Sequence, residues 1–297
     1  MTANSGRFDA RMREDVARVL AEPKIDCHCH VLDPLRFPYG DATPYRPAGQ
    51  EIGTAEQYAQ VRVAYGIERA LLVGPNSGYE LDNRCLLDAL AHGDACLKGI
   101  AVVAHDASDA DLVRLKAAGV IGVAFNATYH GVDYYRDTAS LLSRLAVLDM
   151  CLSLQIEGDQ LVAFAPLLER SGVRVLVDHC GRPAPGAGLA QPGFRALLAL
   201  AATKRVFVKL SGYAKFARSP YPYDDVRPFV DALLDAFTPG GCLWATDWPF
   251  LRAHARLDVG PLLALVHRFV PDAAARHRVL WQTPCRALGF SPDTMPR

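Results

Sequence analysis

Side chains that bind metals and move protons are concentrated in one short stretch of the chain, "KIDCHCH" at residues 24–30. His28 and His30 stand two residues apart, with Asp26 two residues earlier and Cys27 and Cys29 between them. Imidazole, carboxylate and thiolate groups are common ligands and proton carriers. On a β-strand, alternation places Asp26, His28 and His30 on one face and the two cysteines on the other. We therefore expect a histidine face that points into a site and a cysteine face that points into the helix layer.

Two further polar residues end short apolar runs in the same way. His179 follows "VLVD", and Asp247 follows "LWAT". A lone histidine at such a position is usually a structural residue, but three such strand ends together favour a reactive site. Three imidazoles and a carboxylate can polarise a carbonyl group or hold a single metal ion. We predict that His28, His30, His179 and Asp247 converge on one pocket.

The elements that must position these residues alternate regularly along the chain. Amphipathic stretches of helical period, several ending in Gly, separate short apolar runs rich in Val, Ile and Leu. These runs lie at 24–29, 69–74, 98–103, 119–125, 151–156, 173–178, 205–210 and 242–247. Eight such units predict a single (β/α)8 TIM barrel, whose active site lies at the C-terminal ends of the strands. An open doubly wound sheet would show fewer strands and a glycine-rich turn after the first.

The chain shows no linker or second domain. We expect an N-terminal extension at residues 1–23 and the barrel at 24–297. Long loops at 31–53, 126–135 and 181–193 should lie over the mouth of the barrel, because loops of this length in a compact domain usually bind ligands or cover a site.

Composition excludes several classes of partner. The chain is 51% hydrophobic, 22% charged and formally neutral, so neither nucleic acid nor a membrane surface is an expected partner. It lacks an apolar run of about 18 residues and a secretory signal, which indicates a cytoplasmic protein. Eight cysteines without CxxC spacing indicate reduced, structural thiols. The oligomeric state stays open, a homo-oligomer included.

Four motifs carry a resemblance to a known family. "IDCHCH", "VDHCGRP", "VKLSG" and "WATDWP" resemble strand ends of the amidohydrolase superfamily, nearest to the branch with 2-pyrone-4,6-dicarboxylate lactonase and the sugar and muconolactone lactonases. The resemblance runs from about residue 24 to residue 290. It implies a hydrolase that opens a small acidic or sugar-derived lactone. Asp247 would be the general base, and His28, His30 and His179 would polarise the carbonyl or bind a metal.

The resemblance and the expected mouth loops together give a set of candidate substrate contacts. Arg182 would contact an anionic group of the substrate, with other polar side chains assisting. The full set is Arg182, Tyr45, Ser77, Asn126, His130 and Lys215. The dicarboxylate lactonases carry arginine where this chain has Ala124, which provides no charge. A monoacidic or sugar-derived lactone is therefore a better expectation than a dicarboxylated pyrone.

The metal content and two other functions stay open. Two-metal members of the superfamily need a lysine or carboxylate on the fourth strand and a histidine on the fifth, where this chain has "VAFNAT" and "LQIEG". A single metal would use His28, His30, His179 and Asp247, with Glu157 as an additional ligand. We expect no obligatory cofactor, with one Zn²⁺ as the alternative. The other functions are a mononuclear zinc-dependent decarboxylase or deaminase and a non-catalytic small-molecule-binding barrel.

Overall fold

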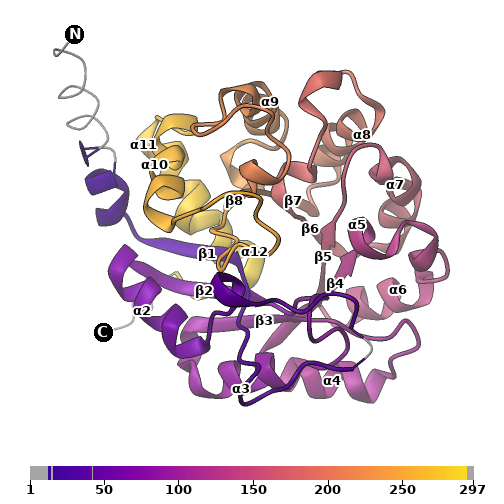
Figure 1. Cartoon of the computed structure of the whole chain (residues 1–297). Coiled ribbons are helices and arrows are strands. Elements are labelled where there is room, and N and C mark those ends of the chain that lie inside the picture. Colours follow the sequence, from indigo (N-terminus) through magenta and orange to yellow (C-terminus); the bar gives the residue numbers. More distant parts are fainter. Residues whose placement is uncertain (1–12, 15, 42, 293–297) are drawn as a thin grey trace, which may run out of the picture.

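The strands form a barrel, as the sequence predicts. The computed structural model describes residues 13, 14, 16–41 and 43–292, so most of the expected N-terminal extension and residues 293–297 lie outside the described residues (Figure 1). Eight parallel strands follow one another around the sheet in chain order. They are β1 (Lys24–Cys29), β2 (Ile67–Val73), β3 (Leu97–Ala101), β4 (Val120–Asn126), β5 (Cys151–Gln155), β6 (Arg174–Val177), β7 (Val206–Leu210) and β8 (Cys242–Trp244).

Helices surround the barrel and cover its outer face (Figure 1). Their starts and stops follow local rules: Thr54 Oγ accepts the first-turn N–H of Gln57, and Gly66 ends the same helix at a φ of +61°. The helices are α2 (Ala55–Tyr65), α3 (Arg84–His92), α4 (Asp109–Ala117), α5 (Ala127–His130), α6 (Ala139–Val147), α7 (Gln160–Ser171), α8 (Pro192–Leu200), α9 (Arg227–Phe237), α10 (Val259–Phe269), α11 (Ala273–His277) and α12 (Thr283–Leu288).

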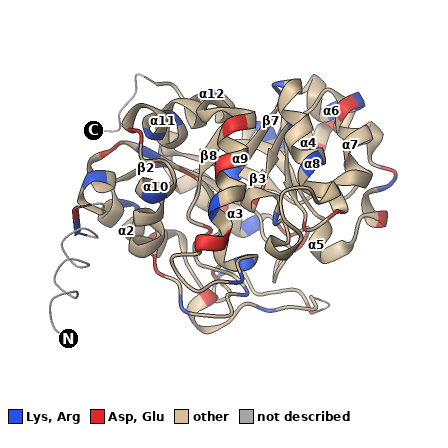
Figure 2. Cartoon of the chain, turned by 90° about the horizontal axis from the view of Figure 1, so that it is seen from above, with Lys and Arg blue, Asp and Glu red and all other residues tan. Residues whose placement is uncertain are grey.

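The outer surface fits the composition. Basic and acidic residues are interspersed along the helices in Figure 2. Among the described residues, none of the helices combines the length and the apolar character of a bilayer-spanning segment.

Apolar side chains fill the barrel and seal its lower end. Inward-facing strand residues such as Ile25, Leu71 and Leu243 pack together with Trp281 and Phe290 from the C-terminal segment. This end of the barrel is therefore a packed core, and the histidine cluster lies at the opposite end of the strands.

The predicted alternation along β1 is wrong at two residues. Asp26 pairs with Ala70 and Cys29 with Leu72, so β1 advances by three residues where β2 advances by two. This bulge shifts the phase of the strand. Cys27 consequently packs inside the barrel, whereas Asp26 accepts a hydrogen bond from the Tyr58 hydroxyl of α2 at 2.7 Å. Asp26 is therefore a structural link to the helix layer and not part of the histidine face.

Backbone hydrogen bonds join the end of β1 to the segment after β8 and so complete the ring of strands at the mouth of the barrel. The Asp247 N–H donates to the His28 carbonyl, and the His30 N–H donates to the Trp248 carbonyl, both at 2.8 Å. The Thr246 N–H donates to Asp26 Oδ1 at 2.9 Å. The first and last strand ends, about 220 residues apart in the chain, are held side by side in this way.

Candidate active site

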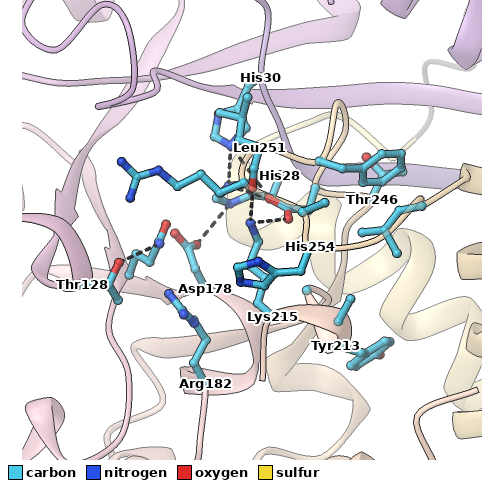
Figure 3. Close-up of a pocket in the computed structure, with 18 of the residues that line it drawn as sticks. His28, His30, Thr128, Asp178, Arg182, Tyr213, Lys215, Thr246, Leu251 and His254 are labelled. Atoms are coloured by element: carbon cyan, nitrogen blue, oxygen red, sulfur yellow. Dashed lines mark hydrogen bonds and ion pairs between the residues drawn. The ribbon is translucent and has the colours of Figure 1, made fainter. Parts of the chain in front are cut away.

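Ion-pair distances bring the four residues at the strand ends together at the mouth of the barrel, and His28 and His30 are labelled in Figure 3. The Nε2 atoms of His28, His30 and His179 lie 3.8, 3.9 and 3.5 Å from Asp247 Oδ1. All four side chains are buried. The structure thus brings together the groups that the sequence places in one pocket.

Local backbone geometry aims His179 and Asp247. Both residues have a left-handed backbone, with φ of +53° and +63°, a conformation that costs a non-glycine residue roughly 1–3 kcal/mol. His179 Nδ1 lies 3.0 Å from Ser211 Oγ. Next to it, Gly212 has a φ of +62°, and a Cβ there would lie 2.5 Å from His179 Nδ1. The Ser-Gly pair after β7 therefore gives His179 a hydrogen-bond partner and the space for its ring.

Burial keeps two of the imidazoles neutral. It lowers the pKa of His30 well below the usual value, and the neighbouring His28 lowers it further. Burial also lowers the pKa of His179 well below its usual value, although Asp247 opposes this effect. Neutral imidazoles offer one N–H donor and one lone pair each, which suits either a carbonyl oxygen or a metal ion.

Asp247 is held as a carboxylate. Burial alone would raise its pKa, but the Lys215 ammonium, His179 and His28 together outweigh burial and lower it. Lys215 Nζ lies 3.0 Å from Asp247 Oδ2. The other oxygen, Oδ1, is buried and accepts no hydrogen bond from the described residues. An unsatisfied buried acceptor costs about 1–3 kcal/mol, so this atom is poised for a ligand that the cavity admits.

The same groups could hold one metal ion. His28, His179 and Asp247 each offer a ligand atom, and the three atoms lie within 4.8 Å of one another. Two imidazoles and a carboxylate match the donor types of a mononuclear zinc site, and Asp247 Oδ1 is without a partner among the described residues. Glu157, the additional ligand considered from the sequence, instead pairs with Arg182 at 2.9 Å.

A cavity of about 800 Å³ is lined at its base by His28, His30 and Asp247. His179 is not among the described lining residues and lies behind Asp247. The wall of the cavity at β4 and β5 is polar but uncharged, with Asn126, Thr128 and Gln155 joined by hydrogen bonds through the Thr128 hydroxyl. Of the candidate substrate contacts, the described lining includes Ser77, Asn126, Arg182 and Lys215.

Tyr45 and His130, the other two candidates, are not among the described lining residues. The Tyr45 hydroxyl donates to Glu51 Oε2 at 2.5 Å, and His130 Nε2 lies 3.2 Å from Asn76 Nδ2. Asn76 does line the cavity. His130 therefore reaches the cavity only through Asn76, and Tyr45 only through Arg252, whose guanidinium lies over its ring.

Arg252 is a lining cation that the sequence analysis missed. Its guanidinium lies over the Tyr45 ring at 4.3 Å from the centroid and 5.5 Å from that of Tyr129. Its backbone N–H donates to Glu51 Oε1, so Glu51 links the loop after β1 to the loop after β8. No carboxylate in the described part of the chain pairs with this guanidinium. Its position in the loop after the last strand, five residues beyond Asp247, is the feature of the sequence that could have identified it as a lining residue.

Lys209 and Asp178 form a second missed feature, an ion pair inside the barrel. Lys209 Nζ lies 2.7 Å from Asp178 Oδ1 and has no exposed surface. Burial alone would raise the pKa of Asp178, but Lys209 and His28 outweigh it and hold that pKa well below its usual value. A lysine inside the apolar run "VFVKL" was the signal, because an unpaired ammonium does not stay in a core.

Comparison with known proteins finds several similar chains. The amidohydrolase family model matches residues 25–290. The 4-sulfomuconolactone hydrolase of Rhizobium radiobacter is 36% identical over 274 residues, which are 89% of each chain. The 2-pyrone-4,6-dicarboxylate hydrolase of Comamonas testosteroni is 29% identical over 88% of each chain. The apo structure of an Agrobacterium tumefaciens protein matches with a TM-score of 0.80 and 25% identity, over 91% of this chain and 97% of that one.

Proposed function

Because the chain belongs to the amidohydrolase family, we propose that it hydrolyses a small lactone that carries an anionic group, with Asp247 as the base that activates water. One observation carries the proposal: a buried Asp247 oxygen at the base of a cavity, without a hydrogen-bond partner among the described residues, lies within 3.9 Å of three imidazoles. The names of the relatives at 36% and 29% identity support the lactone assignment, since both denote hydrolases of anionic lactones.

The reaction begins with water at Asp247. A water molecule donates a hydrogen bond to Oδ1 and attacks the lactone carbonyl, while Asp247 takes its proton. Negative charge then develops on the carbonyl oxygen, and the ring N–H groups of His28 and His179 stabilise it. One such donor typically contributes about a hundred- to a thousandfold in rate.

Collapse of the tetrahedral intermediate opens the ring. The bond between the carbonyl carbon and the ring oxygen breaks, and the protonated Asp247 returns its proton to that oxygen. The product carries a new carboxylate, which releases the second proton of water to solvent. The lowered pKa of Asp247 makes it a modest base and a correspondingly strong acid in this second step.

The chemistry of this proposal requires no metal. If a zinc ion binds, His28, His179 and Asp247 would hold it, and it would supply positive charge for the carbonyl and lower the pKa of water.

Arg252 supports the choice of an anionic substrate. Arg182 and Lys215, the charged candidates from the sequence, already pair with Glu157 and Asp247. Arg252 faces the cavity without an ion-pair partner in the described ranges, and its guanidinium can make two parallel hydrogen bonds to a carboxylate or sulfonate.

A panel of lactones tests the proposal. Carboxylated, sulfonated and neutral sugar lactones are incubated with the purified protein, and acid release is followed with a pH indicator while elemental analysis gives the metal content. We expect turnover of anionic lactones that survives exhaustive chelation. A failure to open any lactone, together with decarboxylation or deamination that depends on bound zinc, would replace this function by the zinc-dependent alternative.

A further inference from the structure

A buried ionic cluster lies inside the barrel directly beneath His28. Lys209 Nζ is 2.7 Å from Asp178 Oδ1, donates to Ser153 Oγ at 2.9 Å, and is 3.1 Å from His28 Nδ1. Lys209 and Ser153 have no exposed surface, and Asp178 is 3% exposed. Of the three histidines of the floor, His28 is the one that this cluster contacts directly.

Counting donors assigns the proton of His28. An ammonium has three N–H donors, and Lys209 has three acceptors within reach only if His28 Nδ1 offers its lone pair. Asp178 Oδ1 competes, since it lies 3.3 Å from the same nitrogen. A proton on Nδ1 would leave one buried Lys209 N–H without an acceptor, at about 1–3 kcal/mol or more. A lone pair on Nδ1 leaves Asp178 satisfied, because Lys209 and Ser153 still donate to it.

The neighbouring histidine fits the same assignment. His30 Nδ1 lies 2.7 Å from the Val73 carbonyl, which can only accept, so His30 carries its proton on Nδ1 and a lone pair on Nε2. His28 Nε2 lies 3.3 Å from His30 Nε2, the nitrogen that carries this lone pair. With its proton on Nε2, His28 donates to His30. With its proton on Nδ1, two lone pairs would face each other in a buried site.

We propose that Lys209 is a positioning residue that holds His28 with its proton on Nε2, which makes His28 a hydrogen-bond donor at the floor of the cavity. The transfer of that donor from His30 Nε2 to the lactone carbonyl oxygen when substrate binds rests on the proposed function. The same arrangement opposes metal binding through His28, because a metal needs the lone pair of Nε2, which becomes available only when the proton moves to Nδ1 and faces Lys209.

Nitrogen-15 NMR of histidine-labelled protein tests the assignment without any substrate. The shifts distinguish the protonated ring nitrogen from the unprotonated one, and His28→Gln identifies the His28 signals among the nine histidines. We expect the His28 proton on Nε2 in the wild type and in the control Ser153→Ala, which keeps the Lys209 contact with His28. In Lys209→Met the proton should move to Nδ1, where Asp178 accepts it.

Two further readouts separate positioning from mere packing. Lys209→Met should lower kcat by about tenfold to a hundredfold with little change in KM, and zinc should bind it more tightly than the wild type in calorimetry. A proton on Nδ1 in wild-type spectra overturns the proposal even if Lys209→Met does not fold. An unchanged His28 tautomer in folded Lys209→Met overturns it as well. Absence of lactone turnover would reject the proposed function and leave the NMR result standing.

Discussion

The floor and the rim of the cavity are built on different principles. The floor, consisting of His28, His30, His179 and Asp247, is buried and is supplied by strand ends. The rim, consisting of Arg252 and Arg256 in the loop after β8, is exposed. Each floor imidazole has a second nitrogen fixed by a partner beneath it, whereas the Arg252 guanidinium lies over tyrosine rings and makes no hydrogen bond or ion pair with another described residue. On the proposed function, this difference assigns the reaction to the floor and the choice of substrate to the rim. Substitutions should accordingly separate into effects on kcat and effects on KM.

The largest effect is expected from Asp247→Asn. The variant removes the base and little volume, so kcat for an anionic lactone should fall by about a thousandfold or more with KM nearly unchanged. Steady-state kinetics and circular dichroism check the rate and the fold together. A folded variant that retains wild-type kcat would refute the role of Asp247.

Gly212→Ala should come next. The new Cβ would lie 2.5 Å from His179 Nδ1 and would displace the ring, so we expect kcat to fall by about a hundredfold. Gly172→Ala is the matched control, because Gly172 also has a positive φ, of +72°, but its Cβ would meet no atom within 4 Å. Equal losses of kcat in the two variants would mean that backbone strain, and not displacement of His179, is responsible.

Acid should destabilise the floor. Burial lowers the pKa of His30 and His179 in the folded state, so the unfolded chain binds more protons below about pH 6.5. Above that pH both histidines are neutral in both states, and the free energy of unfolding is at its full value. As the pH falls toward the pKa values of the folded state, the free energy of unfolding decreases by up to about 1.4 kcal/mol per pH unit for each histidine. Urea unfolding between pH 7 and 5 measures the slope. His92→Gln, at a surface histidine, should leave it unchanged.

Arg252→Gln tests the rim, where we expect an effect on KM and not on kcat. Loss of an unpaired cation at the rim should raise KM for an anionic lactone by about tenfold and leave kcat nearly unchanged. Arg256→Gln is the control on the same loop, because Arg256 already pairs with Asp258 at 3.0 Å. A similar increase in KM for a neutral lactone would show that Arg252 shapes the cavity and does not bind an anion.

The smallest effect should come from Cys27→Ala. This thiol packs within the barrel, so its loss should reduce the free energy of unfolding by about 1 kcal/mol without a change in kcat. Cys96→Ala, at a partly exposed thiol, should reduce it less. A selective loss of kcat in Cys27→Ala would mean that the β1 bulge positions His28 through this side chain.

The sequence predicts the floor better than the rim for a physical reason. Strand ends are set by apolar periodicity, and this local pattern is enough to place His28, His179 and Asp247 at the mouth of a barrel. The bulge in β1 has no such signal, because one extra residue in a buried strand leaves the apolar pattern almost unchanged. Alternation alone therefore puts Asp26 and Cys27 on the wrong faces.

Contacts between distant segments explain the other differences. Lys209 and Asp178 are 31 positions apart and meet only because β6 and β7 are neighbours in the sheet. Arg252 reaches the cavity through a loop whose course depends on Glu51, from the far end of the chain. No local pattern encodes pairings of this kind, so the sequence could not assign Lys215 to Asp247 or Arg182 to Glu157.

Isotope incorporation tests the central claim most directly. An anionic lactone that the protein consumes is turned over once in water enriched in oxygen-18, and the product is analysed by mass spectrometry. If water activated at Asp247 opens the ring, the product carries one heavy oxygen, in its new carboxylate. An unlabelled isomer of the lactone, or a product that has lost carbon dioxide, would contradict hydrolysis at this site.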